Sequence, residues 1–218
     1  MSADRSPVPA WLDPLLAATR EVRAEDLTRF VPPDDAERRS AVLILFGESE
    51  SGPAAEPDLL LIERAHDMRS HAGQPAFPGG ALDPGETPVA AALREAAEET
   101  GLDPAGVDVL GVLPDLWLPP SGFVVTPVLG WWAAPTAVGP RDPAEVASVH
   151  RVALATLTDP ANRFRVRHPS GYTGPAFAAH GLVVWGFTGG LLDRLVYLAG
   201  WERPWDRDIV RDLPPHQQ

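Results

Sequence analysis

Apolar residues are grouped along this chain in two ways, as short runs typical of strands and at the spaced positions typical of helices. The short runs predict strands at residues 41–46, 58–63, 107–112, 123–132 and 146–154. The helical spacing predicts helices at residues 88–100 and 182–198, the second weakened by Gly189 and Gly190. Strands mixed with two well-separated helices indicate one α/β or α+β domain, with helices packed on a mixed sheet.

The helix at residues 88–100 has a start signal and a stop signal. Thr87 can accept a hydrogen bond from a free N–H of the first turn, and Pro88 suits the first helical position. Gly101 suits the left-handed conformation that ends many helices. We therefore expect this helix to be the best-defined element.

The segments outside these elements are rich in proline and glycine. Residues 1–35 are predicted to form a Pro-rich N-terminal arm with one short helix near residues 11–19, and residues 36–218 a single domain. Residues 65–84 show no regular pattern. An irregular stretch of that length inside a compact domain is usually functional.

The predicted helix carries three glutamates on one face. Glu95, Glu98 and Glu99 are spaced i, i+3 and i+4, and each like-charge pair at such spacings costs about 0.2–0.5 kcal/mol. They also lie near the helix C-terminus, where the macrodipole disfavours anions, and Arg94 offsets only part of this. A solvated face is the favoured interpretation of three glutamates alone, but a hard divalent cation with oxygen ligands would resolve the conflict.

Charge and composition exclude several classes of function. The 218 residues carry a formal net charge of -12, which disfavours nucleic acid as a partner but not a phosphate-bearing small molecule held by a metal ion. The chain has no cysteine, hence no disulfide or thiolate chemistry. We expect no secretory signal and no membrane span, because the most apolar run, residues 181–192, is far shorter than the ~20 residues that a bilayer needs. The expected location is cytoplasmic.

The glutamates belong to a longer pattern, G-x5-E-x7-R-E-A-x-E-E-x-G-L. The pattern is formed by Gly80, Glu86, Arg94, Glu95, Ala96, Glu98, Glu99, Gly101 and Leu102. It resembles the complete Nudix box, a far more specific motif than a single glycine-rich loop. The resemblance implies a Nudix-type α/β/α sandwich with a mixed sheet, and hydrolysis of a nucleoside diphosphate linked to another group.

The resemblance also implies which residues hold metal ions. Glu95, Glu98 and Glu99 would bind Mg²⁺ or Mn²⁺, and the carbonyl oxygen of Gly80 would add a ligand. Either Glu95 or Glu99 would assist deprotonation of the attacking water, a choice that the sequence leaves open.

Further roles follow for the residues around the metal ligands. Arg94 would orient the acidic cluster, and Glu86 would brace the loop by pairing with Arg94. Gly79 and Gly80 would allow backbone geometry that a Cβ atom forbids.

A second pattern lies immediately upstream of the box. It consists of Leu60, Leu61, Ile62, Glu63, Arg64, Ala65, Arg69, Gly73, Phe77, Pro78, Gly79 and Gly80. They resemble the signature of coenzyme A pyrophosphatases, with Ile62 in place of a threonine as the one departure. Arg64, Arg69, Gly73, Phe77 and Gly79 would then contact a coenzyme A-like substrate, which would be cut to 3′,5′-ADP and 4′-phosphopantetheine or its acyl form.

The residues of this second pattern also have simpler interpretations. Arginine forks suit phosphate oxygens, but Arg64 and Arg69 each fit a surface salt bridge equally well. Phe77 fits the core better than a stack on a base. The alternatives for the whole chain are a Nudix hydrolase acting on ADP-ribose, a dinucleotide or a nucleoside triphosphate, or a catalytically silent ligand-sensing module.

A few residues outside the motifs also have functional interpretations. Asp142 and Glu145 are candidates for a mobile catalytic base, although a solvated loop is favoured. His66 and His71 fit loop stabilisation better than phosphate contact. The tryptophans fit core or dimer contacts better than an adenine platform, so a homodimer remains open; they lie at positions 131, 132, 185, 201 and 205.

Overall fold

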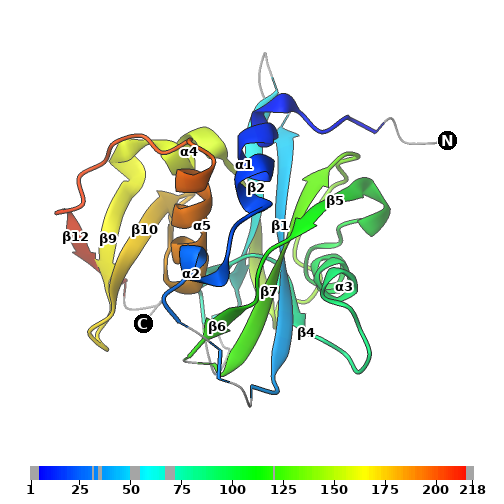
Figure 1. Ribbon diagram of the computed structural model, residues 1–218, viewed down its shortest axis with the longest axis horizontal. Coiled ribbons are helices and arrows are strands. Elements are labelled where there is room, and N and C mark those ends of the chain that lie inside the picture. The colour runs from blue at the N-terminus through cyan, green and yellow to red at the C-terminus, as the bar shows by residue number, and fades with distance from the viewer. Residues whose placement is uncertain are drawn as a thin grey trace.

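A mixed eight-stranded sheet is the centre of the structure, a computed structural model that describes residues 5–30, 32–33, 36–49, 55–66, 72–119 and 121–214. Helix α3 (Pro88–Thr100) covers one face of this sheet. Helices α1 (Asp13–Thr19) and α5 (Gly186–Leu198) cover the other face. Figure 1 shows α3 on the right of the sheet and a second, four-stranded sheet on the left, beyond α5. The expected α/β architecture, with helices on both faces of a mixed sheet, is confirmed.

The strands divide between the two sheets. The main sheet contains β1 (Arg39–Ser49), β2 (Glu56–Arg64), β3 (Pro75–Ala76), β4 (Gly79–Ala81), β5 (Val107–Val112), β6 (Leu116–Leu118), β7 (Phe123–Trp132) and β8 (Val146–Ala153). The second contains β9 (Arg163–Arg167), β10 (Thr173–Ala179), β11 (Leu182–Val184) and β12 (Val210–Asp212). The short helices are α2 (Ala24–Leu27) and α4 (Leu154–Thr158), with 3₁₀ turns at Ala10–Leu12, Pro104–Gly106 and Pro160–Asn162.

Strand β1 lies at the centre of the main sheet, whose order is β3-β2-β1-β7-β5. It pairs parallel with β7 and antiparallel with β2 and β4. Its side chains alternate, so that Leu43 and Leu45 pack against α3 while Ile44 and Phe46 pack on the opposite face. Both faces are covered, and this explains why β1 is a continuous apolar run in the sequence.

The N-terminal segment packs on the same core as the sheet. Leu12 and Leu15 are fully buried in the cluster on the α5 side. The ring of Trp11 lies 6.0 Å from that of Phe46, 6.2 Å from Trp131 and 5.7 Å from Trp201. The short helix predicted near residues 11–19 is confirmed as a 3₁₀ turn followed by α1. The division of the chain at residue 35 stays a prediction.

The helix predicted at residues 182–198 starts later than expected. Residues 182–184 form strand β11, which pairs with β10, and α5 begins at Gly186 after the extended Trp185. The helix runs unbroken through Gly189, where a Cβ atom would lie 2.9 Å from the carbonyl oxygen of Val184 and 3.1 Å from that of Pro175. This glycine therefore permits close packing of the helix on its sheet.

The second sheet was not predicted from the sequence. Its strand β9 mixes arginine with apolar residues, and the first arginine, Arg163, has a fully buried side chain. Arg163 forms an ion pair with Asp193 of α5 and packs against the rings of Phe177 (4.3 Å) and Trp205 (4.7 Å). Two further corrections are the strands β3 and β4 inside the segment expected to be irregular, and residue 154, which begins α4 rather than ending β8.

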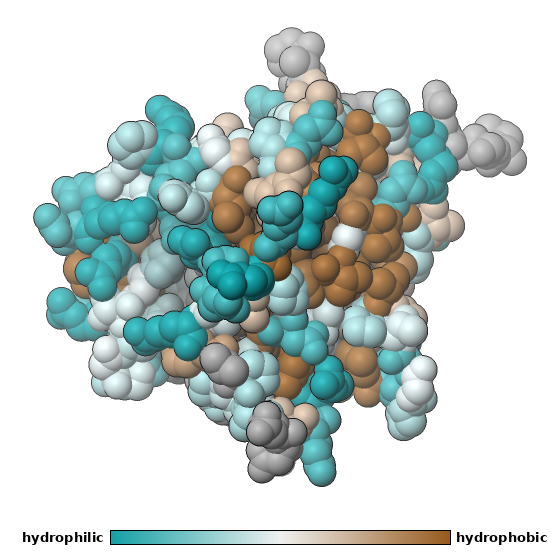
Figure 2. Space-filling model, viewed as in Figure 1, coloured by the Kyte–Doolittle hydropathy of each residue, from teal (hydrophilic) through white to brown (hydrophobic). Residues whose placement is uncertain are grey.

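Apolar residues gather on one part of the surface. Figure 2 shows them mainly on the right of the view, where Figure 1 draws β5 and β7. Strand β5 is an edge strand of the main sheet, and its Val109 and Val112 are exposed. Among the described residues, no helix is long and apolar enough to cross a membrane.

A polar chain connects the main sheet to the second sheet. The Ser148 hydroxyl donates to Glu63 at 2.6 Å and lies 2.6 Å from Nε2 of His150. The His150 ring lies 5.7 Å from the ring of His180, at the turn between β10 and β11. Burial, and then the charge of His180, lower the pKa of His150, while the charge of Glu63 opposes them.

Acid should lower the stability of the folded protein through this row of polar side chains. Since the pKa of His150 is lower in the folded protein than the ordinary value of 6.5 for histidine, the contribution of His150 to stability is present above pH 6.5 and is lost as pH falls through the lowered value. We expect His150→Gln and His180→Asn to reduce the fall in Tm between pH ~7.5 and ~5.5 by at least about 1 °C. Equal slopes of Tm against pH in wild type, these variants and the control His168→Gln would contradict this role.

Candidate active site

Helix α3 has the ends that the sequence predicts. The Thr87 side chain accepts a hydrogen bond from the N–H of Ala90 at 3.2 Å, and Gly101 adopts the left-handed conformation with φ of 74°. These caps fix the register of the helix and hence the direction of its glutamates. The helix lies against β1 and β4, so that its acidic residues meet the glycines of β4.

The three glutamates do not share one exposed face, which corrects the expectation from their spacing. The side chain of Glu98 is 59% exposed and that of Glu95 20% exposed, whereas Glu99 is buried, with 6% exposure. One carboxylate oxygen of Glu99 accepts a hydrogen bond from the backbone N–H of Gly79 at 2.9 Å. Glu99 therefore lies between the helix and the sheet.

Burial makes the negative charge of this site costly. It raises the pKa of Glu99 to about 7, against the opposing effects of the Gly79 N–H and the positive charge of Arg64. The charges of Glu95 and Glu145 raise it further. Burial also raises the pKa of Glu95. The site thus holds more negative charge than its own cations balance, and a divalent cation would relieve it.

Arg94 is the hub of the acidic cluster. Its guanidinium donates two hydrogen bonds to Glu86, at 3.0 and 2.9 Å, so the predicted Glu86–Arg94 pair is confirmed. It also donates to Glu95 at 2.9 Å, to Glu98 at 3.2 Å and to the carbonyl oxygen of Ala81 at 3.0 Å. The bond to Arg94 is the main reason that the pKa of Glu86 is lowered. Arg94 therefore braces the helix against β4 and the loop that follows it.

The two glycines of β4 are required by close contacts. A Cβ atom on Gly79, where φ is 156°, would lie 2.2 Å from the carbonyl oxygen of Ala41 and 2.7 Å from Cα of Val42. A Cβ atom on Gly80 would lie 2.3–2.5 Å from the carboxylate of Glu95. Gly79 thus lets β4 pair closely with β1, and Gly80 leaves room for a carboxylate beside the backbone.

The oxygen ligands of this site suit a hard divalent cation, although their positions do not form a metal-binding arrangement. Among the described residues, no group of three or more histidine, cysteine, aspartate or glutamate side chains lies in a metal-binding arrangement. Arg94 holds Glu95 and Glu98, and the Gly79 N–H holds Glu99. Carboxylate and backbone carbonyl oxygens are nevertheless the ligands that Mg²⁺ and Mn²⁺ prefer. The Glu95 carboxylate lies close to the backbone of Gly80, where a Cβ atom would overlap it.

The upstream pattern contributes one cation to the site. Arg64 ends β2, and its charge acts on Glu99 to lower the pKa of that carboxyl. Its Nε atom is buried without a hydrogen-bond partner. The N–H of Gly73, with φ of 62°, donates to the carbonyl oxygen of Arg64 at 3.1 Å and holds the end of the strand.

Two other predicted substrate contacts have different outcomes. Phe77 is 2% exposed in the main hydrophobic cluster, so its ring fills the core rather than stacking on a substrate, which corrects its assignment. Arg69 lies outside the described residues, as does His71. His66 lies 3.4 Å from Glu63, in agreement with a role in the loop.

Glu145 is the residue whose position the sequence did not reveal. The sequence favours a solvated loop at this position, and Glu145 is indeed exposed. Its charge nevertheless acts on both Glu95 and Glu99. The only signal for it in the sequence was a pair of acidic residues after a Gly-Pro stretch, which is common in loops.

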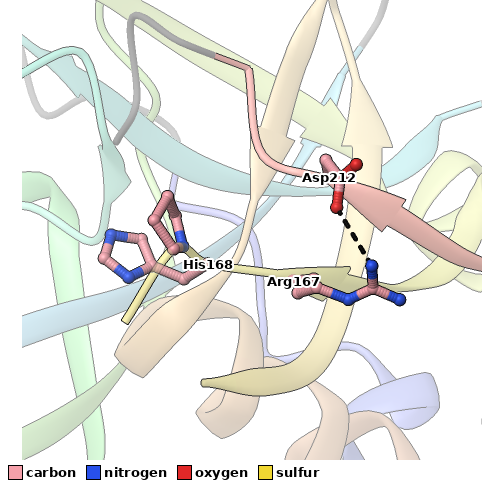
Figure 3. A pocket seen from close by; sticks show the side chains of 4 residues that line it. Arg167, His168 and Asp212 are labelled. Atoms are coloured by element: carbon pink, nitrogen blue, oxygen red, sulfur yellow. Dashed lines mark ion pairs between the residues drawn. The ribbon is translucent and has the colours of Figure 1, made fainter. Parts of the chain in front are cut away.

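Two hollows lie away from this site. The hollow in Figure 3 has a volume of about 250 Å³ and lies at β9 and β12, where Arg167 pairs with Asp212 at 3.6 Å beside His168. The other, of about 290 Å³, has Trp132 and Arg151 in its lining. Neither is lined by a residue that the sequence motifs assign to the site.

The fold and the braced acidic helix define a Nudix-type domain, and comparison with known proteins agrees. Residues 36–172 match the family model of the NUDIX domain. This chain therefore belongs to the Nudix family, whose hydrolases generally use divalent metal ions.

Its relatives include proteins named uncharacterized Nudix hydrolase NudL. The one from Citrobacter koseri is 40% identical over 152 residues, which are 67% of this chain and 77% of the relative. The one from Pectobacterium atrosepticum is 50% identical over 99 residues, 45% of this chain and only 50% of the relative. The crystal structure of the Nudix hydrolase RenU from M. smegmatis matches with a TM-score of 0.50 and 21% identity, over 85% of this chain and 98% of that one. This last likeness concerns the fold alone.

Substitution of Gly79 and of Gly80 should distinguish a residue needed for folding from one needed for the active site. Gly79→Ala places a methyl group against backbone atoms, so we expect Tm to fall by about 5–10 °C, from about 2–3 kcal/mol of overlap and strain. Gly80→Ala meets only the end of a flexible side chain. It should leave Tm within about 3 °C of wild type while displacing Glu95 and lowering turnover at least about tenfold.

Thermal melting and a hydrolysis assay check both outcomes. Gly190→Ala is the matched control, because nothing lies within 4 Å of a Cβ atom at that position of α5. The interpretation fails if Gly79→Ala and Gly80→Ala destabilise the protein equally.

Proposed function

We propose that this protein is a metal-dependent pyrophosphohydrolase that cuts coenzyme A or acyl-coenzyme A to 3′,5′-ADP and 4′-phosphopantetheine or its acyl form. The observation that carries the proposal is the buried Glu99 carboxylate. It is held by the Gly79 N–H at 2.9 Å, its pKa is raised mainly by burial and further by the charges of Glu95 and Glu145, and the positive charge of Arg64 acts on it. Buried like charges of this kind suit a site for a divalent cation and a phosphate group.

In this proposal Glu95, Glu98, Glu99 and the carbonyl oxygen of Gly80 hold Mg²⁺ or Mn²⁺. Such ions neutralise phosphate oxygens and lower the pKa of a bound water. Glu98 is the most exposed of the three glutamates and is free to turn from Arg94 toward a ligand.

The remaining residues of the motif keep these ligands in place. Arg94 stays bonded to Glu86, so the helix keeps its orientation when an acidic neighbour leaves the guanidinium. The Gly79 N–H fixes one oxygen of Glu99 and leaves the other for a ligand. This division of tasks supports metal binding by the helix and bracing by β4 and its following loop.

Coenzyme A is the proposed substrate because of the pattern upstream of the Nudix box. Its Arg64 lies on the acidic side of the sheet, where a guanidinium fork suits an anionic substrate. Arg69 and Gly79 complete the proposed contacts, with Gly73 holding the strand end. ADP-ribose, a dinucleotide or a nucleoside triphosphate remains the second candidate, since these share the pyrophosphate but not the 3′-phosphate of coenzyme A.

A substrate panel tests this function directly. The protein is incubated with Mg²⁺ or Mn²⁺ and coenzyme A, ADP-ribose or NADH, and the products are identified by mass. We expect 3′,5′-ADP and 4′-phosphopantetheine as the main products. Preferred cleavage of ADP-ribose or NADH would overturn the coenzyme A assignment, and no cleavage of any substrate would favour a ligand-sensing module.

Loss of a single metal-binding carboxylate should abolish most turnover. Glu98→Gln and Glu99→Gln should each lower kcat at least about a hundredfold while the fold survives, because an amide is a poor ligand for a hard cation. Glu56→Gln, at an exposed position on β2, is the control and should keep wild-type turnover. Near-normal kcat in both site variants would remove the metal-site assignment.

Metal ions should stabilise the fold by mass action. Adding millimolar Mg²⁺ or Mn²⁺ after EDTA should raise Tm by several degrees, at about 2–4 °C per kcal/mol of binding free energy. In Glu99→Gln the increment should shrink, although the metal-free variant should be no less stable, since it lacks a buried charge. An equal increment in wild type and Glu99→Gln would count against Glu99 as a ligand.

The role of Arg64 can be tested by comparing substrates with and without the 3′-phosphate of coenzyme A. If Arg64 binds that group, coenzyme A should be preferred over 3′-dephospho-coenzyme A by about ten- to a hundredfold in kcat/KM, the value of one charge-assisted hydrogen bond. Arg64→Ala should shrink this ratio, whereas the exposed Arg20→Ala should not. A ratio unchanged in Arg64→Ala would assign Arg64 to the pyrophosphate instead.

A further inference from the structure

A hollow of about 290 Å³ lies at the end of the main sheet that is far from the acidic cluster. Arg151 lines this hollow and pairs at 2.8 Å with Asp58, near the start of β2. Arg64, whose charge acts on Glu99, ends the same strand. At about 3.3 Å per residue, the strand separates Asp58 from Arg64 by roughly 20 Å. The hollow is close in size to the smallest small-molecule sites, at about 300 Å³, and is separate from the active site.

Two N–H donors of residues that line this hollow are buried and have no hydrogen-bond partner among the described residues. They are Nε1 of Trp132, a residue that is 1% exposed, and Nε of Arg151. The Arg151 guanidinium lies over the Trp132 ring, 4.9 Å from its centroid, so the two residues form one wall. Buried donors in native proteins are nearly always satisfied by protein, water or a ligand. This wall therefore suits a hydrogen-bond acceptor.

The charges around the hollow disfavour an anion as that acceptor. The guanidinium of Arg151 is already paired with Asp58, whose side chain is only 3% exposed. Glu48 adds a second carboxylate, which lines the hollow. One oxygen of Glu48 accepts a hydrogen bond from Nε1 of Trp11 at 2.8 Å, and this bond fixes the carboxylate and leaves its other oxygen for a ligand. Two carboxylates and one guanidinium repel an anion, so the ligand that fits is uncharged.

We propose that this hollow is a second binding site, which takes an uncharged, planar carboxamide. The carbonyl oxygen of the ligand accepts from the N–H groups of Trp132 and Arg151, and its amide N–H donates to Glu48. A carboxamide carries an acceptor and a donor on one flat group, which matches the donors and the carboxylate of the lining. A carboxylate of the same shape lacks the donor and is repelled by Glu48 and Asp58. The site does not rest on the proposed function.

Benzamide and benzoate are the matched probes, because they share the ring and differ in carboxamide against carboxylate. Each is titrated into the metal-free protein labelled with ¹⁵N-tryptophan, and the indole N–H resonances are followed by NMR. We expect benzamide to shift the Trp132 resonance, assigned by its absence in Trp132→Phe, to a plateau. Benzoate should bind at least about fivefold more weakly, the effect of one like charge in water. Trp185 is the internal control, since its Nε1 is also buried without a partner among the described residues but lines neither hollow.

Three variants locate the binding. Trp132→Phe keeps a ring but removes the donor, so the affinity for benzamide, followed by the line width of the ligand, should fall at least about fivefold. Glu48→Gln alters a half-buried side chain outside the core, and it should reduce the preference for benzamide over benzoate at least about threefold by removing one repelling charge. Glu98→Gln changes the distant acidic helix and should bind benzamide as wild type does.

Each other outcome would overturn the second site. A Trp132 resonance that benzamide does not move would show that water alone satisfies these donors. An equal response to benzamide and benzoate would remove the charge selectivity, and an equal shift of Trp185 would make the binding non-specific. Loss of benzamide binding in Glu98→Gln would assign the ligand to the acidic site instead. None of these results bears on hydrolysis, which the substrate panel tests separately.

Discussion

Glu99 accepts a hydrogen bond from the N–H of Gly79, and this buried contact joins the acidic helix to the sheet. A buried carboxylate is costly unless it is hydrogen-bonded or paired with a cation. The contact requires a residue without a side chain at position 79, since a Cβ atom there would overlap the backbone of β1. The close pairing of β4 with β1 and the position of α3 both depend on it.

The remaining contacts of the site distribute the excess negative charge. Arg94 shares its guanidinium among Glu86, Glu95 and Glu98, and the positive charge of Arg64 acts on Glu99. The helix is thus braced by contacts that persist when one carboxylate turns to a ligand. A rigid helix with one exposed and two constrained carboxylates is well suited to bind and release a divalent cation together with its substrate.

The sequence predicted those parts of the site that depend on local spacing, and it failed where distant residues meet. The Glu86–Arg94 pair spans eight residues of one loop and helix, and the motif placed it correctly. The prediction of an exposed face for Glu99 was wrong because helical spacing says nothing about which neighbour lies over the helix. Phe77 was assigned to the substrate by a pattern, but it lies in the core because of the packing of both sheet faces.

By itself the sequence determined helix α3, its caps and the order of its acidic residues, because these depend on hydrogen bonds and spacings within a few positions. It also determined the strands of the main sheet that are long and continuously apolar. Only the tertiary structure decided the second sheet, the late start of α5 and the burial of Glu99. Each of these is fixed by pairing or packing between distant segments, as in the contact between Gly79 and Glu99, and local sequence carries no record of which segments will meet.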